Sequence, residues 1–400
     1  MNVDLLDPEL WQSNPHDLWA RLRTGSPVYH DKRNGLFGLT RHADLLTAER
    51  RADIFPSAHS YPAIPAREEM NMIAQDDPGH RAQRMLVQRF FAPGAVARRE
   101  PEVRAIVTEL IDAGLQRGSM EVVHDLAGQL PARLTCRLMG FPEDLWPKLM
   151  QWSERLMRTD MHQRDGHTAV EFMTANMELF EVTNAQVVSR RRAGGTTETA
   201  SDLLGAWAHA RIGGSPLDMR TIYHESGLFV SGGSETTRTT IAHGLRVLID
   251  HPEHWDALAA NRSLIPGAVE EIFRWVTPLN NFFRVCVVPT ELSGTRINPG
   301  DRVIMIYPSA NRDETVFEDP FRFDIRRTPN HHLSFGNGPH MCVGAPLARL
   351  TMRVLLEELT RRVERMRVVS EPDVEANIFA RAVRQFDIAL TPRETIGATA

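Results

Sequence analysis

The chain has 400 residues, 42% of them hydrophobic, and a formal net charge of −5, so it holds enough apolar material for a sizeable core. Nearly all positive charge is arginine, because Lys32 and Lys148 are its only lysines. The one basic run, 190–192, is too short to indicate nucleic-acid binding. Three scattered cysteines exclude a disulfide framework, so we expect a cytoplasmic protein.

The chain shows no sign of membrane targeting or of division into domains. Residues 1–7 lack the basic start and apolar core of a signal peptide, and no apolar run is long enough to predict a membrane anchor. The polar, glycine-rich stretch 193–201 predicts an exposed loop, not a domain boundary. No internal repeat is visible, so we expect a single domain over 1–400.

The N-terminal part predicts short helices, a hairpin and a loop. Residues 15–23 are periodic as in an amphipathic helix, and 28–40 predict a hairpin because Asn34-Gly35 separates two apolar runs. Helical periodicity returns at 42–52, and 56–75 is loop-like. A loop this long inside a compact domain is usually functional.

A helix with a basic face is predicted after residues 77–79. His80 and Arg84 are four residues apart, so they lie on the same face. A face of this kind can bind anionic groups buried beside an apolar surface, although a solvated basic face is the ordinary alternative.

The middle of the chain predicts helices. Residues 102–191 are helical in pattern with glycine breaks. Ser215-Pro216 then supplies an N-cap and a first-turn proline, and apolar positions recur through Ile249 before Pro252 ends them. A helix of about 34 residues would span roughly 50 Å and could cross the whole molecule.

This long helix has a defect at its middle. Gly232-Gly233 is followed by Glu235, Thr236 and Thr237. Two interior glycines cost on the order of 1–2 kcal/mol relative to alanine, and β-branched residues add to that. One interpretation is close packing against another helix. The other is that side chains must be absent here for a functional reason.

Two further elements carry charged residues. Pro266 begins a predicted helix in which Glu271 and Arg274 share one face. Alone this pair is weak evidence, because such ion pairs usually contribute little. Residues 280–285 predict a strand that carries Arg284.

The run 335–344, Phe-Gly-Asn-Gly-Pro-His-Met-Cys-Val-Gly, is the most informative part of the chain. It places Cys342 on a glycine-rich loop just before a helix with Pro346 in its first turn. Backbone N–H groups and the helix N-terminus can stabilise a thiolate that binds iron. Phe335 would shield the sulfur, and His340 could face a carboxylate on the edge of a macrocycle. A buried free thiol is the alternative.

With this run the chain resembles the cytochrome P-450 family of haem-thiolate monooxygenases, whose signature F-G-x-G-x-H-x-C-x-G it matches at every fixed position. The resemblance implies a mainly α fold with small β-sheets and haem b between the long central helix and the loop of Cys342, the iron ligand. It places His80, Arg84 and Arg284 on the haem propionates. The implied cofactor-binding residues are His80, Arg84, Gly232, Gly233, Arg284, Phe335, His340, Cys342 and Gly344.

The resemblance also gives the helix defect a role. The family carries a G-G/A-x-x-T segment for oxygen activation, which Gly232-Gly233 and Thr236 match. Thr236 is then the catalytic threonine and Glu235 its acid, because a hydroxyl can donate a proton that a carboxylate resupplies through water. The glycines would remove side chains where a small ligand must fit.

Glu271 and Arg274 match the family's E-x-x-R pair, which implies a structural role beneath the haem. We expect an arginine of the 320–326 segment, Arg322 or Arg326, to close this network.

The implied function is insertion of one oxygen atom from O2 into a C–H bond of a large apolar molecule. A ferredoxin or flavodoxin with an NAD(P)H reductase would supply electrons, and we expect a monomer. Alternatives are a peroxide-dependent haem-thiolate enzyme and a non-catalytic haem sensor or binding protein. A positive docking surface is expected from Arg81, Arg312, Arg349 and Arg353.

The expected substrate pocket is compatible with several classes of apolar molecule. Loop 56–75 would cover the distal face of the haem, and the mixed lining could hold a sterol, terpenoid, lipid or polyketide. Arg381 could bind a carboxylate or lie on the surface. Glu314, where many members carry proline, and the 266–271 segment resemble a subgroup that oxidises sterol or branched-lipid side chains. The expected pocket residues are Tyr61, Ile64, Met72, Leu279, Asn280 and Phe379.

Overall fold

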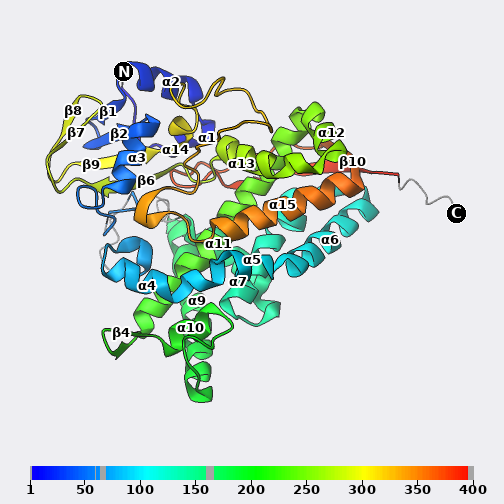
Figure 1. Ribbon diagram of the computed structural model, residues 1–400, viewed down its shortest axis with the longest axis horizontal. Helices are drawn as coiled ribbons and strands as arrows, with labels where there is room; N and C mark the ends of the chain where they lie inside the picture. The colour runs from blue at the N-terminus through cyan, green and yellow to red at the C-terminus, as the bar shows by residue number, and fades with distance from the viewer. Residues whose placement is uncertain (1, 59, 64–68, 159–165, 395–400) are drawn as a thin grey trace.

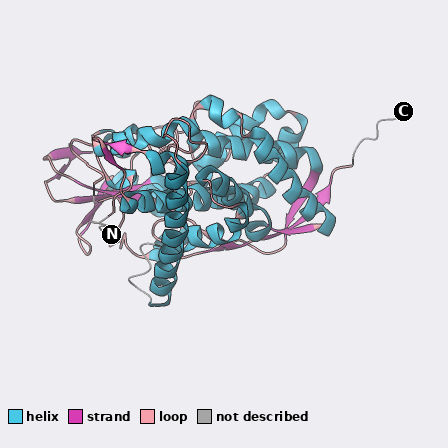
Figure 2. Cartoon of the chain, turned by 90° about the horizontal axis from the view of Figure 1, so that it is seen from below, coloured by secondary structure: helices cyan, strands magenta, loops and turns pink. Residues whose placement is uncertain are grey.

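The computed structural model describes residues 2–58, 60–63, 69–158 and 166–394, which are mostly helical with small sheets (Figures 1 and 2). The α-helices are α1 (Pro8–Ser13), α2 (His16–Gly25), α3 (His42–Arg50), α4 (Gly79–Val87), α5 (Pro93–Ala97), α6 (Glu100–Arg117), α7 (Gln129–Met139), α8 (Trp146–Leu156), α9 (Gly166–Ala193), α10 (Leu203–His209), α11 (Met219–Asp250), α12 (Pro252–Ala260), α13 (Ile265–Val276), α14 (Tyr307–Ala310) and α15 (Ala345–Arg362). No helix within these residues is both long and apolar enough to cross a bilayer.

The strands form several small sheets. They are β1 (Val28–Asp31), β2 (Leu36–Leu39), β3 (Ser119–Glu121), β4 (Arg211–Ile212), β5 (Ser215–Pro216), β6 (Asn281–Val285), β7 (Thr290–Leu292), β8 (Thr295–Ile297), β9 (Arg302–Ile306), β10 (Val363–Val368), β11 (Asp373–Val374), β12 (Val383–Gln385) and β13 (Asp387–Pro392). The largest has the order β1-β2-β9-β6 and lies at the N-terminal end of the molecule (Figure 1).

This sheet joins distant parts of the chain. β1 and β2 form the hairpin predicted from Asn34-Gly35, with Asp31 opposite Leu36. β2 then pairs in parallel with β9, and β9 pairs antiparallel with β6. β6 is therefore an edge strand, and it carries Arg284.

Helix α11 has 32 residues and runs through the centre of the fold (Figure 1). The prediction that Ser215-Pro216 begins it was wrong, because these residues form β5 and pair with β4. Asp218 is the N-cap instead, and its carboxylate accepts the N–H of Thr221 at 2.9 Å. The predicted end before Pro252 is confirmed.

The two halves of α11 pack into different hydrophobic cores. Ile222 and Phe229 belong to a core shared with α7, α8, α9 and α10. Ile241 and Leu245 belong to a core shared with α6, α13 and α15. The glycine pair lies between these two packed halves, so the middle of the helix is left to border a cavity.

Candidate active site

A cavity of about 350 Å³ lies between the middle of α11 and the loop before α15. Residues from α4, α11, β6 and the cysteine loop converge on it although they are far apart in sequence. Every residue expected around the haem lines it: His80, Arg84, Gly232, Gly233, Arg284, Phe335, His340, Cys342 and Gly344.

The loop backbone holds Cys342 on the cavity wall. Its N–H donates to the carbonyl of Phe335 at 2.8 Å. Burial raises the pKa of the thiol, while the N–H groups of Gly344 and Ala345 and the guanidinium of Arg84 act in the opposite direction. The environment thus supplies the donors that a metal-bound thiolate needs, and coordination to a metal ion would remove the proton outright.

The turn in this loop requires glycine at two positions. Gly336 and Gly338 have φ angles of +65° and +69°. A Cβ on Gly338 would also lie 2.4 Å from the carbonyl oxygen of Glu49. The loop therefore folds closely over α3, as its glycine content predicted.

Basic groups gather at one part of the cavity. His80 is buried, and its Nδ1 lies 3.1 Å from Asp77 Oδ1, while its Nε2 has no hydrogen-bond partner among the described residues. The rings of His80 and His340 are 4.3 Å apart. Arg84 donates to the carbonyl of Met341, and the buried Arg284 donates to that of Phe283, both at 2.7 Å. A buried imidazole nitrogen that becomes a donor when the ring is protonated, beside two guanidinium groups, suits the carboxylates of a haem.

Two residues at this part of the cavity were missed by the sequence analysis. Glu49 lines the cavity and accepts hydrogen bonds from the Tyr307 hydroxyl and the Asn337 N–H. Burial raises the pKa of Glu49, and Arg284 lowers it. No local signal could have found the pair, because Glu49 sits in an ordinary helical pattern and Tyr307 follows a buried strand.

The two glycines of α11 have different surroundings. A Cβ on Gly232 would meet no heavy atom within 4 Å, whereas one on Gly233 would lie 2.9 Å from Thr135 Oγ1 on α7. Both interpretations of the defect therefore apply, open space at Gly232 and helix packing at Gly233. The Thr236 hydroxyl lines the cavity and donates to the carbonyl of Gly232 at 2.9 Å.

Glu235 lies behind this wall and does not line the cavity. Its carboxylate is buried and bound to Arg238, with Oε1 2.6 Å from Nη2, while Oε2 has no hydrogen-bond partner in the part of the chain that the structure describes. Burial raises the pKa of Glu235, and Arg238 opposes the rise. Arg238 also reaches Glu154 on α8 at 3.2 Å. The predicted acid is thus adjacent to Thr236 in sequence but held in an ion-pair network.

The Glu271–Arg274 pair is fully buried, and the Arg274 guanidinium donates to both carboxylate oxygens at 2.7 Å. The expectation that Arg322 or Arg326 closes this network was wrong, because Arg327 Nε lies 3.2 Å from Glu271 Oε2. The side chain of Arg322 is 62% exposed and only its carbonyl accepts from Arg274, while Arg326 is exposed.

Four of the expected substrate-pocket residues line the cavity: Tyr61, Met72, Leu279 and Phe379. Ile64 lies outside the described residues. The prediction was wrong for Asn280, whose buried amide donates to the carbonyls of Asn377 and Ile378 behind the wall. Arg381 is partly buried and donates to the carbonyl of Val276, so it lies neither in the cavity nor free on the surface.

The expected positive surface is only partly present. Arg312 was wrongly included, because it is buried and donates to the carbonyls of Arg274 and Trp275. Arg81 is exposed. Arg349 and Arg353 are partly exposed but paired with acidic residues, so their charge is locally balanced.

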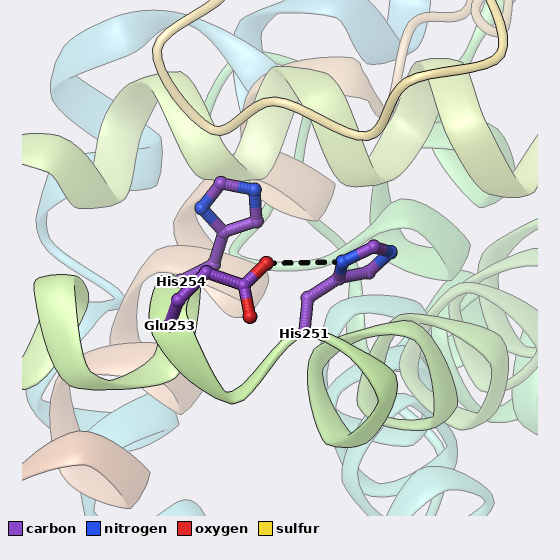
Figure 3. A group of neighbouring side chains, drawn as sticks. All are labelled: His251, Glu253 and His254. Atoms are coloured by element: carbon purple, nitrogen blue, oxygen red, sulfur yellow. Dashed lines mark hydrogen bonds and ion pairs between the residues drawn. The ribbon is translucent and has the colours of Figure 1, made fainter.

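Among the described residues, His251, Glu253 and His254 also place possible metal-ligand atoms within 4.8 Å of one another. Figure 3 shows His251 and Glu253 facing each other, with Nδ1 3.2 Å from Oε1. His254 Nε2 is 3.0 Å from the carbonyl of Phe323. These residues do not line the cavity, so they belong to the junction of α11 and α12.

Comparison with known proteins gives consistent matches. The model of the Cytochrome P450 family matches residues 155–381. Steroid C26-monooxygenase of Mycobacterium tuberculosis is 32% identical over 409 residues, covering 99% of each chain. Methyl-branched lipid omega-hydroxylase of Mycobacterium bovis is 34% identical, covering 85% of this chain and 80% of that protein. The structure of a Mycobacterium marinum cytochrome P450 in complex with pseudoionone aligns with a TM-score of 0.90 at 28% identity, covering 97% of this chain and 98% of that chain.

Proposed function

This chain belongs to the cytochrome P450 family of haem-containing monooxygenases, and on that premise we propose that it hydroxylates a C–H bond of a sterol, terpenoid, lipid or polyketide-like molecule. The proposal treats residues 1–400 as one catalytic domain. The observation that carries it is that Cys342, Gly232 and Thr236 line one mostly apolar cavity.

The residues present fit haem b. Cys342 would ligate the iron, and His80, Arg84 and Arg284 would bind the propionates, supported by the unpaired Nε2 of His80. Burial lowers the pKa of His340, so its imidazole would be a neutral donor beside them. When bound, the haem supplies the iron centre that activates O2, and its thiolate ligand favours cleavage of the O–O bond.

Side chains of α11 would deliver protons to the cavity. The Thr236 hydroxyl, now bonded to the carbonyl of Gly232, can turn to donate its proton into the cavity. Glu235 would then take up a proton from solvent and pass it to Thr236 through water. Because Glu235 is bound to Arg238, its carboxylate must first exchange this partner for water, which makes the ion pair a control point for proton delivery.

We also propose an external electron donor, a ferredoxin or flavodoxin reduced by an NAD(P)H-dependent reductase. It would dock beside the Cys342 loop, where Arg81 is exposed and Arg349 lies over the Phe335 ring at 4.5 Å. Charge complementarity with the exposed Arg81 would raise the association rate more than the affinity.

The proposal is tested by the spectrum of the reduced, haem-loaded protein under carbon monoxide. Thiolate ligation should give a strongly red-shifted Soret band, and Cys342→Ser should abolish it. A histidine-type spectrum would reject the assignment. Turnover with ferredoxin, reductase and NAD(P)H but not with hydrogen peroxide alone separates the proposed activity from a peroxide-dependent enzyme, and no turnover with either would favour a sensor.

A further inference from the structure

A second polar group lines the cavity without contacting the residues assigned to the haem. Glu69 is its centre. The Tyr61 hydroxyl donates to Glu69 Oε2 at 2.5 Å, and the Asn71 amide donates to Oε1 at 2.7 Å. A carboxylate has about four lone-pair positions, so two remain available after these bonds.

The Glu69 carboxylate has no cationic partner within 4 Å in the described parts of the chain. Burial raises its pKa, and the two neutral donors only partly offset this. Glu69 is partly buried, and removing a carboxylate from water is unfavourable unless it is paired or protonated. The hydrogen bonds from Tyr61 and Asn71 nevertheless hold the Glu69 carboxylate on the wall of an otherwise mostly apolar cavity.

A second buried carboxylate makes this arrangement less favourable still. Glu225 on α11 accepts the N–H of Met72 at 2.8 Å, but its Oε2 has no hydrogen-bond partner within the described ranges. Burial raises the pKa of Glu225 to about 8, and the charge of Glu69 adds to the rise. Glu225 does not line the cavity, so of these two carboxylates Glu69 is the one that can meet a ligand.

The neighbours of Glu69 do not neutralise it. The Tyr223 hydroxyl is 2.5 Å from Asn176 Oδ1, and burial raises the pKa of Tyr223 to about 12, with a contribution from Glu69. His224 Nδ1 accepts the N–H of Met70 at 2.9 Å, so this ring is neutral. This part of the cavity therefore combines a fixed acceptor with neutral polar groups.

We propose that Glu69 is a substrate-recognition residue that accepts a hydrogen bond from an amine or hydroxyl group on an otherwise apolar substrate. The inference rests on the proposed function and narrows its substrate class. A ligand with such a donor satisfies the carboxylate, whereas an ether of the same shape leaves it unpaired. Sites built to bind a donor discriminate strongly against analogues that lack it.

The test uses three steroids of one skeleton that carry a 3-amino, 3-hydroxyl or 3-methoxy group. Their dissociation constants are measured by equilibrium dialysis and by the spin-state shift of the haem-loaded protein. We expect the amine and alcohol to bind the wild type at least about tenfold more tightly than the ether. Glu69→Gln should remove the amine preference and leave ether binding within about twofold.

Tyr223→Phe is the matched control, because it removes a neighbouring hydroxyl but keeps the carboxylate, and it should retain the amine preference. Equal affinities in the wild type, weak binding of all three steroids, or a preference that survives Glu69→Gln would overturn the inference. Each variant is first checked for the red-shifted carbon monoxide band. Loss of that band in the wild type would reject the proposed function instead, so the two failures are distinguishable.

Discussion

Glu235 and Arg238, one turn apart on α11, form a buried ion pair with Oε1 and Nη2 2.6 Å apart. The pair lies within the stretch of α11 that borders the cavity, although neither residue lines it, and Glu154 of α8 binds the same guanidinium. Buried pairs of this kind add little net stability, but the loss of one partner is strongly destabilising. The position of Glu235 and Arg238 beside the cavity suggests that this buried ion pair has a functional role.

Glu235→Gln should lower product formation at least about tenfold, because it removes the group that returns protons to Thr236. It should also lower the free energy of unfolding by about 1–3 kcal/mol, since Arg238 keeps only Glu154. Turnover, its solvent isotope effect and denaturant unfolding provide the measurements. Glu154→Gln is the control, because it changes the same ion-pair network but keeps Glu235. An equal loss of turnover in that variant would show that turnover depends on the network and not on Glu235 as a proton source.

Thr236→Ala should continue to consume NAD(P)H but divert it to hydrogen peroxide, because the proton held at this hydroxyl is lost. Thr236→Ser keeps the hydroxyl and should stay largely coupled. The ratio of product to NAD(P)H consumed checks this. Unchanged coupling in the alanine variant would exclude the hydroxyl as a proton donor.

The glycine pair offers a comparison within a single helix. Gly232→Ala should preserve stability, or raise it by up to about 1 kcal/mol through helix propensity, while weakening carbon monoxide binding, because its methyl group enters open space. Gly233→Ala should destabilise by about 1–3 kcal/mol, because its Cβ meets Thr135. Thermal unfolding and carbon monoxide titration measure both effects. Adding Thr135→Ala to Gly233→Ala should restore the lost stability. If it did not, the packing explanation would be wrong.

Glu271→Gln should destabilise the protein by about 3–5 kcal/mol, because Arg274 and Arg327 would lose a fully buried carboxylate. Arg322→Ala should change stability by less than about 0.5 kcal/mol, since its side chain is mostly exposed. Denaturant unfolding compares the two. A large effect of Arg322→Ala would contradict the assignment of Arg327 as the third member.

Glu225 predicts a pH dependence of stability. Its folded pKa of about 8 lies above the ordinary value of 4.5, so between these values the folded protein retains a proton that the unfolded chain releases. Stability should therefore fall as pH rises through this window, by up to about 1.4 kcal/mol per pH unit for one proton. Glu225→Gln should flatten the curve. The measurement is the free energy of unfolding of both proteins between pH 5 and pH 8. If the two proteins showed the same pH dependence, Glu225 would not be its source.

The sequence predicted the parts of the site that are encoded locally. The cysteine loop, the glycine pair and the His80/Arg84 face each lie within one short segment, so spacing alone placed them on the correct elements. The residue at which α11 begins could not be predicted from local sequence alone. Ser215-Pro216 has the composition of a helix start, but its residues pair with β4, so the helix begins after Asp218 instead.

Residues that depend on tertiary contacts could not be predicted. Arg327 differs from its neighbour Arg326 only in the direction of its side chain, which the fold of the 320–330 segment sets. Glu49 and Glu69 reach the cavity through a helix and a loop that carry no motif. Asn280 follows the cavity-lining Leu279 but turns toward the backbone at 377–378.

The charged residues around α11 also connect the centre of the fold to the end of the chain. Arg158 and Glu154 of the α8 region find further partners in Glu375 and Arg384, near the end of the chain. A chain that ended at residue 370 would contain every haem contact named above, yet it would lack these partners and Phe379 of the cavity wall. Residues 371–394 therefore serve the substrate side of the cavity rather than the cofactor side, although they follow the cysteine ligand in sequence.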